Sequence, residues 1–89
     1  KKWQCNNLVA GAVTLVYNHH KRDIANHLGE IQLQYPDEIL SVQRFTLNEQ
    51  YSMEVIALNG ISARLTELAE KLISEKGIQH GKLTMSRFD

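Results

Sequence analysis

The stretch SVQRFTLNEQYSMEVIALNG, residues 41–60, contains two extended apolar runs around a short polar turn. β-Branched and aromatic residues on both sides of such a turn are typical of a β-hairpin. We therefore predict one strand over residues 39–47 and another over 52–58, joined across the NEQY turn. The dipeptide Asn59-Gly60 is expected to end the second strand.

The residues before this hairpin predict a strand and a helix. Residues 8–17, LVAGAVTLVY, have almost no polar content, which suits a strand that is buried on both faces. Apolar residues then recur at helical spacing until Pro36, which ends the helix because the residue before a proline avoids the helical region. Asn18 is available as the N-cap. The apolar positions of this helix are Ile24, Leu28 and Ile31.

The residues after the hairpin predict a second helix and a last strand. Residues 61–77, ISARLTELAEKLISEKG, place their apolar side chains on one stripe, and Gly77 is a C-terminal stop. Residues 78–88 form a short final strand. The element order is therefore β-α-β-β-α-β, the ferredoxin-like plan of the α+β class, in which two helices cover one face of a four-stranded antiparallel sheet.

The second face of this sheet also needs a cover, because the predicted strands carry apolar residues on both faces. Two helices with one apolar stripe each can cover only one face. We therefore expect another copy of the chain to cover the other face. The apolar strand residues on which this expectation rests are Val9, Val13, Leu15, Leu40, Val42 and Ile56.

Composition narrows the possible functions. At 89 residues the chain is one domain, and its ten basic and ten acidic residues cancel, so net charge does not draw it to nucleic acid. A single cysteine, Cys5, excludes an internal disulfide and fits a reducing compartment. No apolar run approaches the roughly 20 residues that span a bilayer. The sequence has no glycine-rich phosphate loop and no recognisable nucleophile with an ordered histidine and acid, so we do not expect an enzyme.

Three separated motifs carry a family resemblance: VYNHHKRDIANHLGEIQ at 16–32, MEVIALNG at 53–60 and AEKLISEKGIQHGKL at 69–83. Over residues 8–85 the chain resembles the C-terminal regulatory domain of the nickel-responsive transcriptional regulators. The resemblance implies an ACT-like fold, a dimer of such domains that pairs into a tetramer, and DNA contact only through an N-terminal ribbon-helix-helix domain outside this chain.

The resemblance also divides the sequence. Residues 1–7 would be a linker or tail from the DNA-binding domain, and residues 8–89 would be the ACT-like regulatory and oligomerisation domain. Such a regulator works in the cytoplasm, which agrees with the single cysteine.

The family's nickel site falls on four residues of this chain. In the family, two histidines on the second strand and a cysteine at the start of the third hold nickel together with a histidine of a facing subunit. By resemblance, the histidines correspond to Arg44 and Thr46, the cysteine to Ser52, and the facing histidine to Leu33. None of these residues supplies the imidazole or thiolate that nickel favours. We therefore expect no nickel at the family site, and we expect no cofactor.

Arg44 instead suggests an ion pair. With a turn through Asn48–Gln50, Thr46 falls opposite Ser52 and Arg44 opposite Glu54, within reach of a guanidinium–carboxylate contact. Our hypothesis is that this pair holds the subunit interface in place of the metal. Two alternatives stay open. In the first, both charges face solvent and contribute little. In the second, the polar side chains here form an anion or small-molecule pocket. The residues of that pocket would be Arg44, Thr46, Tyr51 and Ser52.

The remaining residues that could bind a metal give only weak indications of a site. His20, Asp23 and His27 recur at helical spacing, so they could form a surface transition-metal site, although solvated side chains or helix caps are the simpler interpretation. His80 is expected to make a structural hydrogen bond. Cys5 has no activating neighbour in sequence and is expected to be inert.

Taken together, the sequence predicts an effector-sensing and tetramerisation domain of a transcription factor that resembles the nickel-responsive regulators. A purely structural assembly domain is the first alternative. An ACT-like module that binds a small molecule in a metabolic regulator is the second. In each case the partner is another copy of the chain, and neither a membrane nor direct DNA contact is expected.

Overall fold

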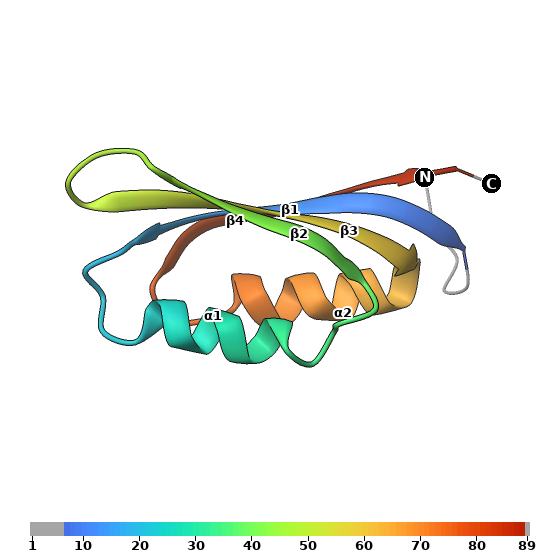
Figure 1. Cartoon of the computed structure of the whole chain (residues 1–89), viewed down its shortest axis with the longest axis horizontal. Helices are drawn as coiled ribbons and strands as arrows, with labels where there is room; N and C mark the ends of the chain where they lie inside the picture. The colour runs from blue at the N-terminus through green and yellow to red at the C-terminus, as the bar shows by residue number, and fades with distance from the viewer. Residues whose placement is uncertain (1–6, 89) are drawn as a thin grey trace.

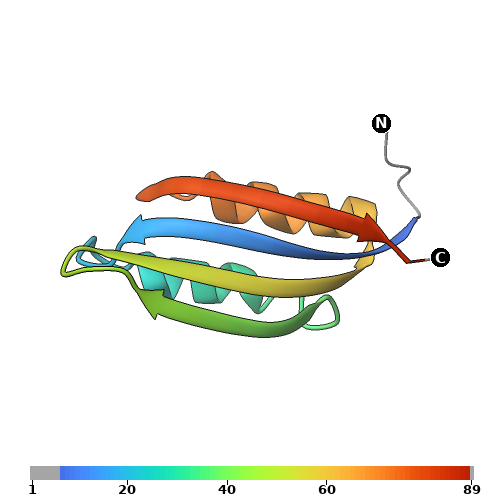
Figure 2. The same ribbon diagram turned by 90° about the horizontal axis from the view of Figure 1, so that it is seen from above.

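A computed structural model describes residues 7–88 and contains six regular elements. Strand β1 is Leu8–Asn18, helix α1 is Ile24–Gln32, β2 is Ile39–Thr46, β3 is Tyr51–Ile61, α2 is Ser62–Ile73 and β4 is Ile78–Arg87. The four strands form one sheet in the order β2-β3-β1-β4, and each neighbouring pair is antiparallel. Both helices lie against the same face of the sheet (Figures 1 and 2), so the predicted ferredoxin-like α+β fold is confirmed.

The core lies between the sheet and the two helices. In β3 every second residue from Ser52 to Leu58 is buried, which is the alternation expected when only one face of a strand is covered. Leu28 of α1 and Leu65 and Leu72 of α2 fill the opposite side of the core. The buried apolar strand residues are Val9, Val13, Leu15, Tyr17, Ile56 and Leu58.

The register of the hairpin agrees with the sequence-based prediction. Across β2 and β3, Arg44 pairs with Glu54 and Thr46 pairs with Ser52. These side chains point to the helix side of the sheet, because Ser52 and Glu54 are buried residues of the β3 alternation. A short turn between Thr46 and Tyr51 closes the hairpin, and the side-chain oxygen of Asn48 accepts hydrogen bonds from the backbone of Gln50 and Tyr51.

One predicted strand boundary is wrong. Asn59-Gly60 does not end β3, because Asn59 pairs with Ala10 and Gly60 pairs with Val9, and the strand continues to Ile61. Gly60 has a φ of 147°, which glycine adopts without strain, so the strand passes through this residue. The last strand lies where it was predicted, and it pairs with β1 over most of its ten residues.

The predicted start of the first helix is wrong as well. Asn18 is the last residue of β1 rather than an N-cap, and its side-chain oxygen accepts a hydrogen bond from the backbone N–H of His20. Helix α1 begins at Ile24, after Asp23, whose φ of 64° is left-handed and whose side chain makes no capping hydrogen bond. The intervening residues form a turn rather than the first turn of a helix.

The uncovered face of the sheet differs from the prediction in its residues. Val9, Val13, Leu15 and Ile56 are all buried under the helices, and Val42 lies on that same side because it pairs with Ile56. The opposite face, which we call the open face, is made by the alternate residues of the strands. Rows across it follow the strand register: Phe45–Met53–Val16–His80, Gln43–Val55–Thr14–Lys82 and Ser41–Ala57–Ala12–Thr84. The side chains at the centre of the open face are apolar or small, and Lys82 of these rows lies at the β4 edge.

In the described part of the chain, neither helix has the length and apolar character that crossing a membrane requires.

Candidate functional site

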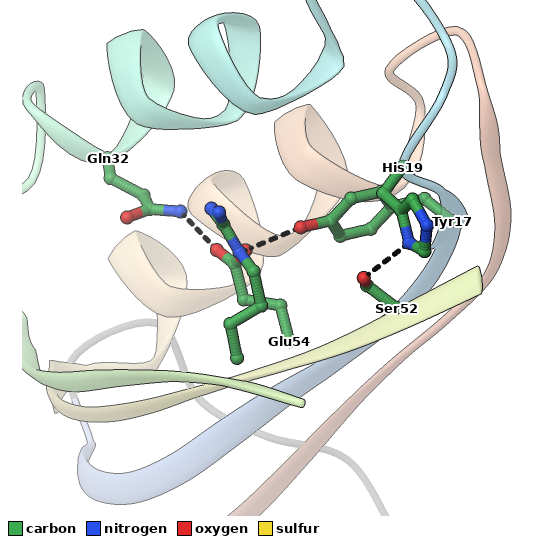
Figure 3. A network of polar contacts seen from close by, with 6 residues as sticks. Tyr17, His19, Gln32, Ser52 and Glu54 are labelled. Carbon is green, nitrogen blue, oxygen red and sulfur yellow. Dashed lines mark hydrogen bonds and ion pairs between the residues drawn. The ribbon is translucent and has the colours of Figure 1, made fainter. Parts of the chain in front are cut away.

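A buried carboxylate forms the centre of the most polar region of the core. Glu54 of β3 is only 1% exposed, although it lies in the layer between the sheet and the helices. Three donors surround it: the Tyr17 hydroxyl at 3.0 Å and the Arg44 Nε at 3.2 Å from Oε1, and the Gln32 Nε2 at 2.9 Å from Oε2 (Figure 3). A buried charge is stable only when it is paired and hydrogen-bonded, and Glu54 meets both conditions.

The donors come from three different elements. Tyr17 extends from β1, Gln32 is the last residue of α1, and Arg44 is on β2. The carboxylate therefore joins two strands and a helix end to β3. We refer to Tyr17, Gln32, Arg44 and Glu54 as the Glu54 centre.

Arg44 reaches this centre from the surface. Its side chain is 53% exposed, its Nε contacts Glu54, and its charge also acts on the neighbouring Tyr17 hydroxyl. The guanidinium is always charged, so it supplies a fixed positive charge beside the buried carboxylate.

Tyr17 keeps its proton in this environment. Burial, followed by the neighbouring Glu54 carboxylate, raises the pKa of the Tyr17 hydroxyl to about 12. Tyr17 therefore acts as a donor to Glu54 throughout the physiological pH range.

A second set of polar contacts lies beside the Glu54 centre. Nδ1 of His19 lies 2.8 Å from Oγ of Ser52, which is 3% exposed (Figure 3). Nε2 of His19 and Nε2 of His20 lie 2.8 Å and 2.7 Å from the same atom, the carbonyl oxygen of Glu49. The backbone N–H of His19 donates to the Gln50 carbonyl at 3.0 Å. These hydrogen bonds connect the loop after β1 to the β2–β3 turn.

The four positions equated with nickel ligands have different surroundings. Leu33 follows α1, is 80% exposed and lines an open groove with Gln32 and Ile39. Thr46 is exposed at the end of β2, Ser52 is buried against His19, and Arg44 is in contact with Glu54.

The surface metal candidates are not brought together. His20 and Asp23 precede α1, so the helical face expected for them with His27 is not formed. His27 instead contacts Glu75, with 3.0 Å between Nδ1 and Oε1. Within residues 7–88 no group of three or more histidine, cysteine, aspartate or glutamate side chains is arranged to hold a metal ion.

His80 and Cys5 are the remaining residues singled out from the sequence. His80 is exposed on the open face, where it pairs with Val16, and its structural hydrogen bond stays a prediction. Cys5, and residues 1–6 of the predicted linker, lie outside the described residues.

Sequence reasoning missed Tyr17, Gln32 and His19. Tyr17 had a usable signal, since period-two alternation from Leu15 places it on the same face as Glu54 once the strands are paired. Gln32 had none, because the position at which α1 ends depends on its packing. His19 became visible only when the loop after β1 proved not to be helical.

The comparison with family models decides where the chain belongs. Residues 10–86 match the model described as the NikR C-terminal nickel-binding domain. The chain belongs to the NikR C-terminal domain family. This is a family of nickel-responsive transcription regulators and not of enzymes, in agreement with the prediction from sequence.

Two relatives illustrate the similarity. A protein of Thermococcus onnurineus named as a nickel-responsive regulator is 45% identical over 78 residues, which are 88% of this chain and 56% of the relative. One of Pyrococcus abyssi with the same name is 39% identical over 87 residues, 97% of this chain and 63% of the relative. The chain thus spans less than two thirds of these relatives.

Solved structures support the fold alone. The uncharacterized protein TM1266 from Thermotoga maritima has a TM-score of 0.77 and 15% identity, covering 88% of this chain and 96% of that chain. The ACT domain of GTP pyrophosphokinase from Chlorobium tepidum has a TM-score of 0.71 and 15% identity, covering 88% and 99%. This NikR-type domain therefore has the ACT-like architecture.

Proposed function

We propose that this NikR-type domain is the effector-responsive assembly domain of a transcription regulator, and that the Arg44–Glu54 pair stands where the family holds nickel. The observation that carries the proposal is the 3.2 Å contact between the Arg44 Nε and the buried Glu54 carboxylate. A metal dication and a guanidinium are both cations that can neutralise a buried carboxylate, so one can replace the other in this role.

The donor chemistry supports the absence of nickel at these positions. Leu33 has no donor atom, and a protonated guanidinium at Arg44 cannot ligate a cation. The hydroxyls of Thr46 and Ser52 are neutral oxygen donors, whereas nickel in this family's geometry favours soft thiolate and imidazole. These four residues do not fit the ion, so we assign no step of the mechanism to it.

Self-association is the second part of the proposal, and a second copy of the chain is the partner. The open face presents Val16, Met53 and Val55 at its centre with no charge among them. Strand β2 is an edge strand that exposes Val42 and Phe45 and has no proline or lysine to discourage pairing. An apolar face and an unprotected edge favour burial against another copy.

The rest of the regulator would supply DNA binding. The chain covers at most 63% of the two relatives described above, so a DNA-binding segment can lie in the remainder of such a protein. The domain would then act from the cytoplasm by setting the separation of DNA-binding heads, and an effector that favours one subunit arrangement would change that separation.

A gain-of-function experiment tests the assignment. In a His20→Gln background, which removes one imidazole beside the hairpin turn, the protein is compared with a variant carrying Leu33→His, Arg44→His, Thr46→His and Ser52→Cys. Nickel is titrated against the melting temperature of both proteins. We expect nickel to raise the melting temperature of the four-residue variant only, because a ligand that binds only the folded state stabilises it.

One result would contradict the assignment of these four positions. Stoichiometric nickel binding by the starting protein that Ser52→Ala or Thr46→Val abolishes would contradict the replacement of the metal. Self-association is measured separately, by the mass of the protein in solution without metal.

One observation favours a second candidate, a module that binds a small anion. Arg44 donates its Nε to Glu54 while its side chain stays 53% exposed, so the guanidinium can meet a carboxylate or phosphate from solvent. Phosphate and dicarboxylates titrated against the melting temperature would reveal such a ligand. A domain that responds to no titrant but still associates would be a purely structural assembly domain.

A further inference from the structure

A groove runs between helix α1 and the start of β2, and we call it the α1 groove. Its volume is about 670 Å³, which lies within the roughly 300–1,000 Å³ of typical small-molecule sites. Most of its wall is aliphatic, so it suits the apolar body of a small ligand. The apolar residues of the wall are Ala25, Gly29, Leu33, Pro36 and Ile39.

Gly29 keeps the α1 groove open. It lies inside α1, where glycine destabilises a helix relative to alanine. Its φ is not positive, and a Cβ at this position would meet nothing within 4 Å. Neither backbone conformation nor close packing therefore requires glycine here. What the missing side chain leaves is the space of the groove itself.

The electrostatics of the α1 groove favour a cation. Among the described residues that line it, Glu30 is the one ionised group, and none is a lysine, arginine or histidine. The last turn of α1 also has no basic residue, and the C-terminal end of a helix carries a partial negative charge. A positively charged group is therefore the complement of this surface.

Gln32 connects the α1 groove to the Glu54 centre. Its Nε2 donates to Oε2 of Glu54 at 2.9 Å, and its amide oxygen is turned away from that carboxylate (Figure 3). Gln32 also lines the groove, so this oxygen can accept from a ligand there. A donor on the oxygen would polarise the amide and strengthen its hydrogen bond to Glu54, as in other chains of hydrogen bonds.

We propose that the α1 groove binds a small aliphatic amine in its ammonium form. The ammonium group donates to the Glu30 carboxylate and the Gln32 amide oxygen, and the aliphatic body packs against Leu33, Pro36 and Ile39. This binding goes beyond the proposed function and does not depend on how Arg44 replaces nickel. Only the step from the ligand through Gln32 to subunit assembly rests on the proposed function.

Nuclear magnetic resonance titration of the ¹⁵N-labelled full chain tests the proposal with three probes of equal length: hexylammonium, hexanol and hexanoate. We expect hexylammonium to bind most tightly and hexanoate least, and hexylammonium to shift the side-chain amide signal of Gln32. In Glu30→Gln the affinity for hexylammonium should fall about 2–5-fold, the range for an exposed ion pair. The affinity for hexanol should not change. Glu30 is exposed, so the fold should tolerate this substitution.

Two variants serve as controls. Gly29→Leu fills the groove and should bind none of the probes, and its melting temperature shows that it is folded. Glu70→Gln removes an acid from the exposed side of α2 and should leave all three affinities unchanged.

The proposal is overturned if hexanol binds as well as hexylammonium, if Gly29→Leu retains binding, or if the Gln32 signal does not respond. A lower mass of Gly29→Leu in solution would also overturn it, because the groove would then be a contact between copies. Failure of the proposed function appears separately, in the nickel titration and in the mass of the wild type without any probe.

Discussion

The Tyr17 hydroxyl donates to Glu54 across a diagonal of the sheet. Tyr17 is paired with Ser52 in the β1–β3 ladder, and Glu54 is paired with Leu15, yet the phenol oxygen lies 3.0 Å from the Glu54 carboxylate. The long side chain thus leans along the strand, as diagonal neighbours on one face of a sheet can. This contact places an acid of raised pKa directly against a buried charge, and pH can therefore probe it.

Alkaline pH should destabilise the protein through Tyr17. Its pKa is about 12 in the folded chain and about 10 in the unfolded chain, so the folded state holds the proton more tightly. Stability from this group is complete below pH 10 and is lost as the pH rises towards 12. Thermal melts at intervals from pH 8 to 12 should show a steeper decline for the wild type than for Tyr17→Phe. Parallel curves would contradict the coupling, since the other tyrosines titrate in both proteins.

Removal of Arg44 should cost more than removal of both charges. Arg44→Ala leaves the Glu54 carboxylate without its cation and should lower the free energy of unfolding by about 1.5–3 kcal/mol, the range for hydrogen bonds to charged groups. The double variant Arg44→Ala/Glu54→Gln should lose less, because a neutral amide does not need the cation and Gln32 can rotate its own amide to accept from it. Denaturant unfolding of both single variants and the double variant completes the cycle. An Arg44→Ala protein as stable as the wild type would mean that the pair contributes nothing.

A lysine at position 44 should not restore the pair. Arg44 contacts Glu54 through Nε, part-way along the side chain, whereas lysine carries its charge only at the tip. We expect Arg44→Lys to be closer in unfolding free energy to Arg44→Ala than to the wild type. A lysine variant that matches the wild type would show that charge alone is sufficient.

Two glycines should respond in opposite directions to alanine. A Cβ at Gly81 of β4 would lie 2.5 Å from Cγ1 of Ile73, so Gly81→Ala should force α2 away from the sheet and cost about 1–3 kcal/mol. A Cβ at Gly29 of α1 meets nothing within 4 Å, so Gly29→Ala should stabilise the helix by about 0.5–1 kcal/mol. Chemical denaturation measures the free energy of unfolding of both variants. A Gly81→Ala protein as stable as the wild type would contradict the close packing of α2 against β4.

A charge on the open face should prevent self-association. Val55 lies at the centre of that face and outside the helix-covered core, so Val55→Glu should reduce the mass in solution without unfolding the monomer. Ala63→Glu adds the same charge on the exposed side of α2 and is the matched control. Sedimentation of the three proteins at equal concentration measures the effect. If Val55→Glu and the wild type have equal masses in solution, the open face is not the surface through which copies associate.

The alternation and spacing of apolar residues predicted the element order and the hairpin register. Arg44 falls opposite Glu54 because a fixed turn length determines every pair that follows it. The strand ends were harder to predict, since Asn59-Gly60 is locally a turn signal but its backbone pairs with β1 in the sheet. Tertiary pairing overrides local preference at that position.

The candidate site was only partly predictable for a related reason. Glu54 and Arg44 are linked by strand register, which sequence can give. Gln32 and His19 reach their partners through a helix end and a loop, and their positions depend on how α1 packs. Asp23 shows the same dependence, because its left-handed backbone starts α1 later than the apolar spacing indicates.

Each of the three donors to Glu54 is supplied in cis, from β1, α1 or β2 of the same polypeptide. Dilution therefore removes a neighbouring copy but does not take away any of these three contacts. The polar contacts around Glu54 can therefore form during synthesis, before the chain meets another copy.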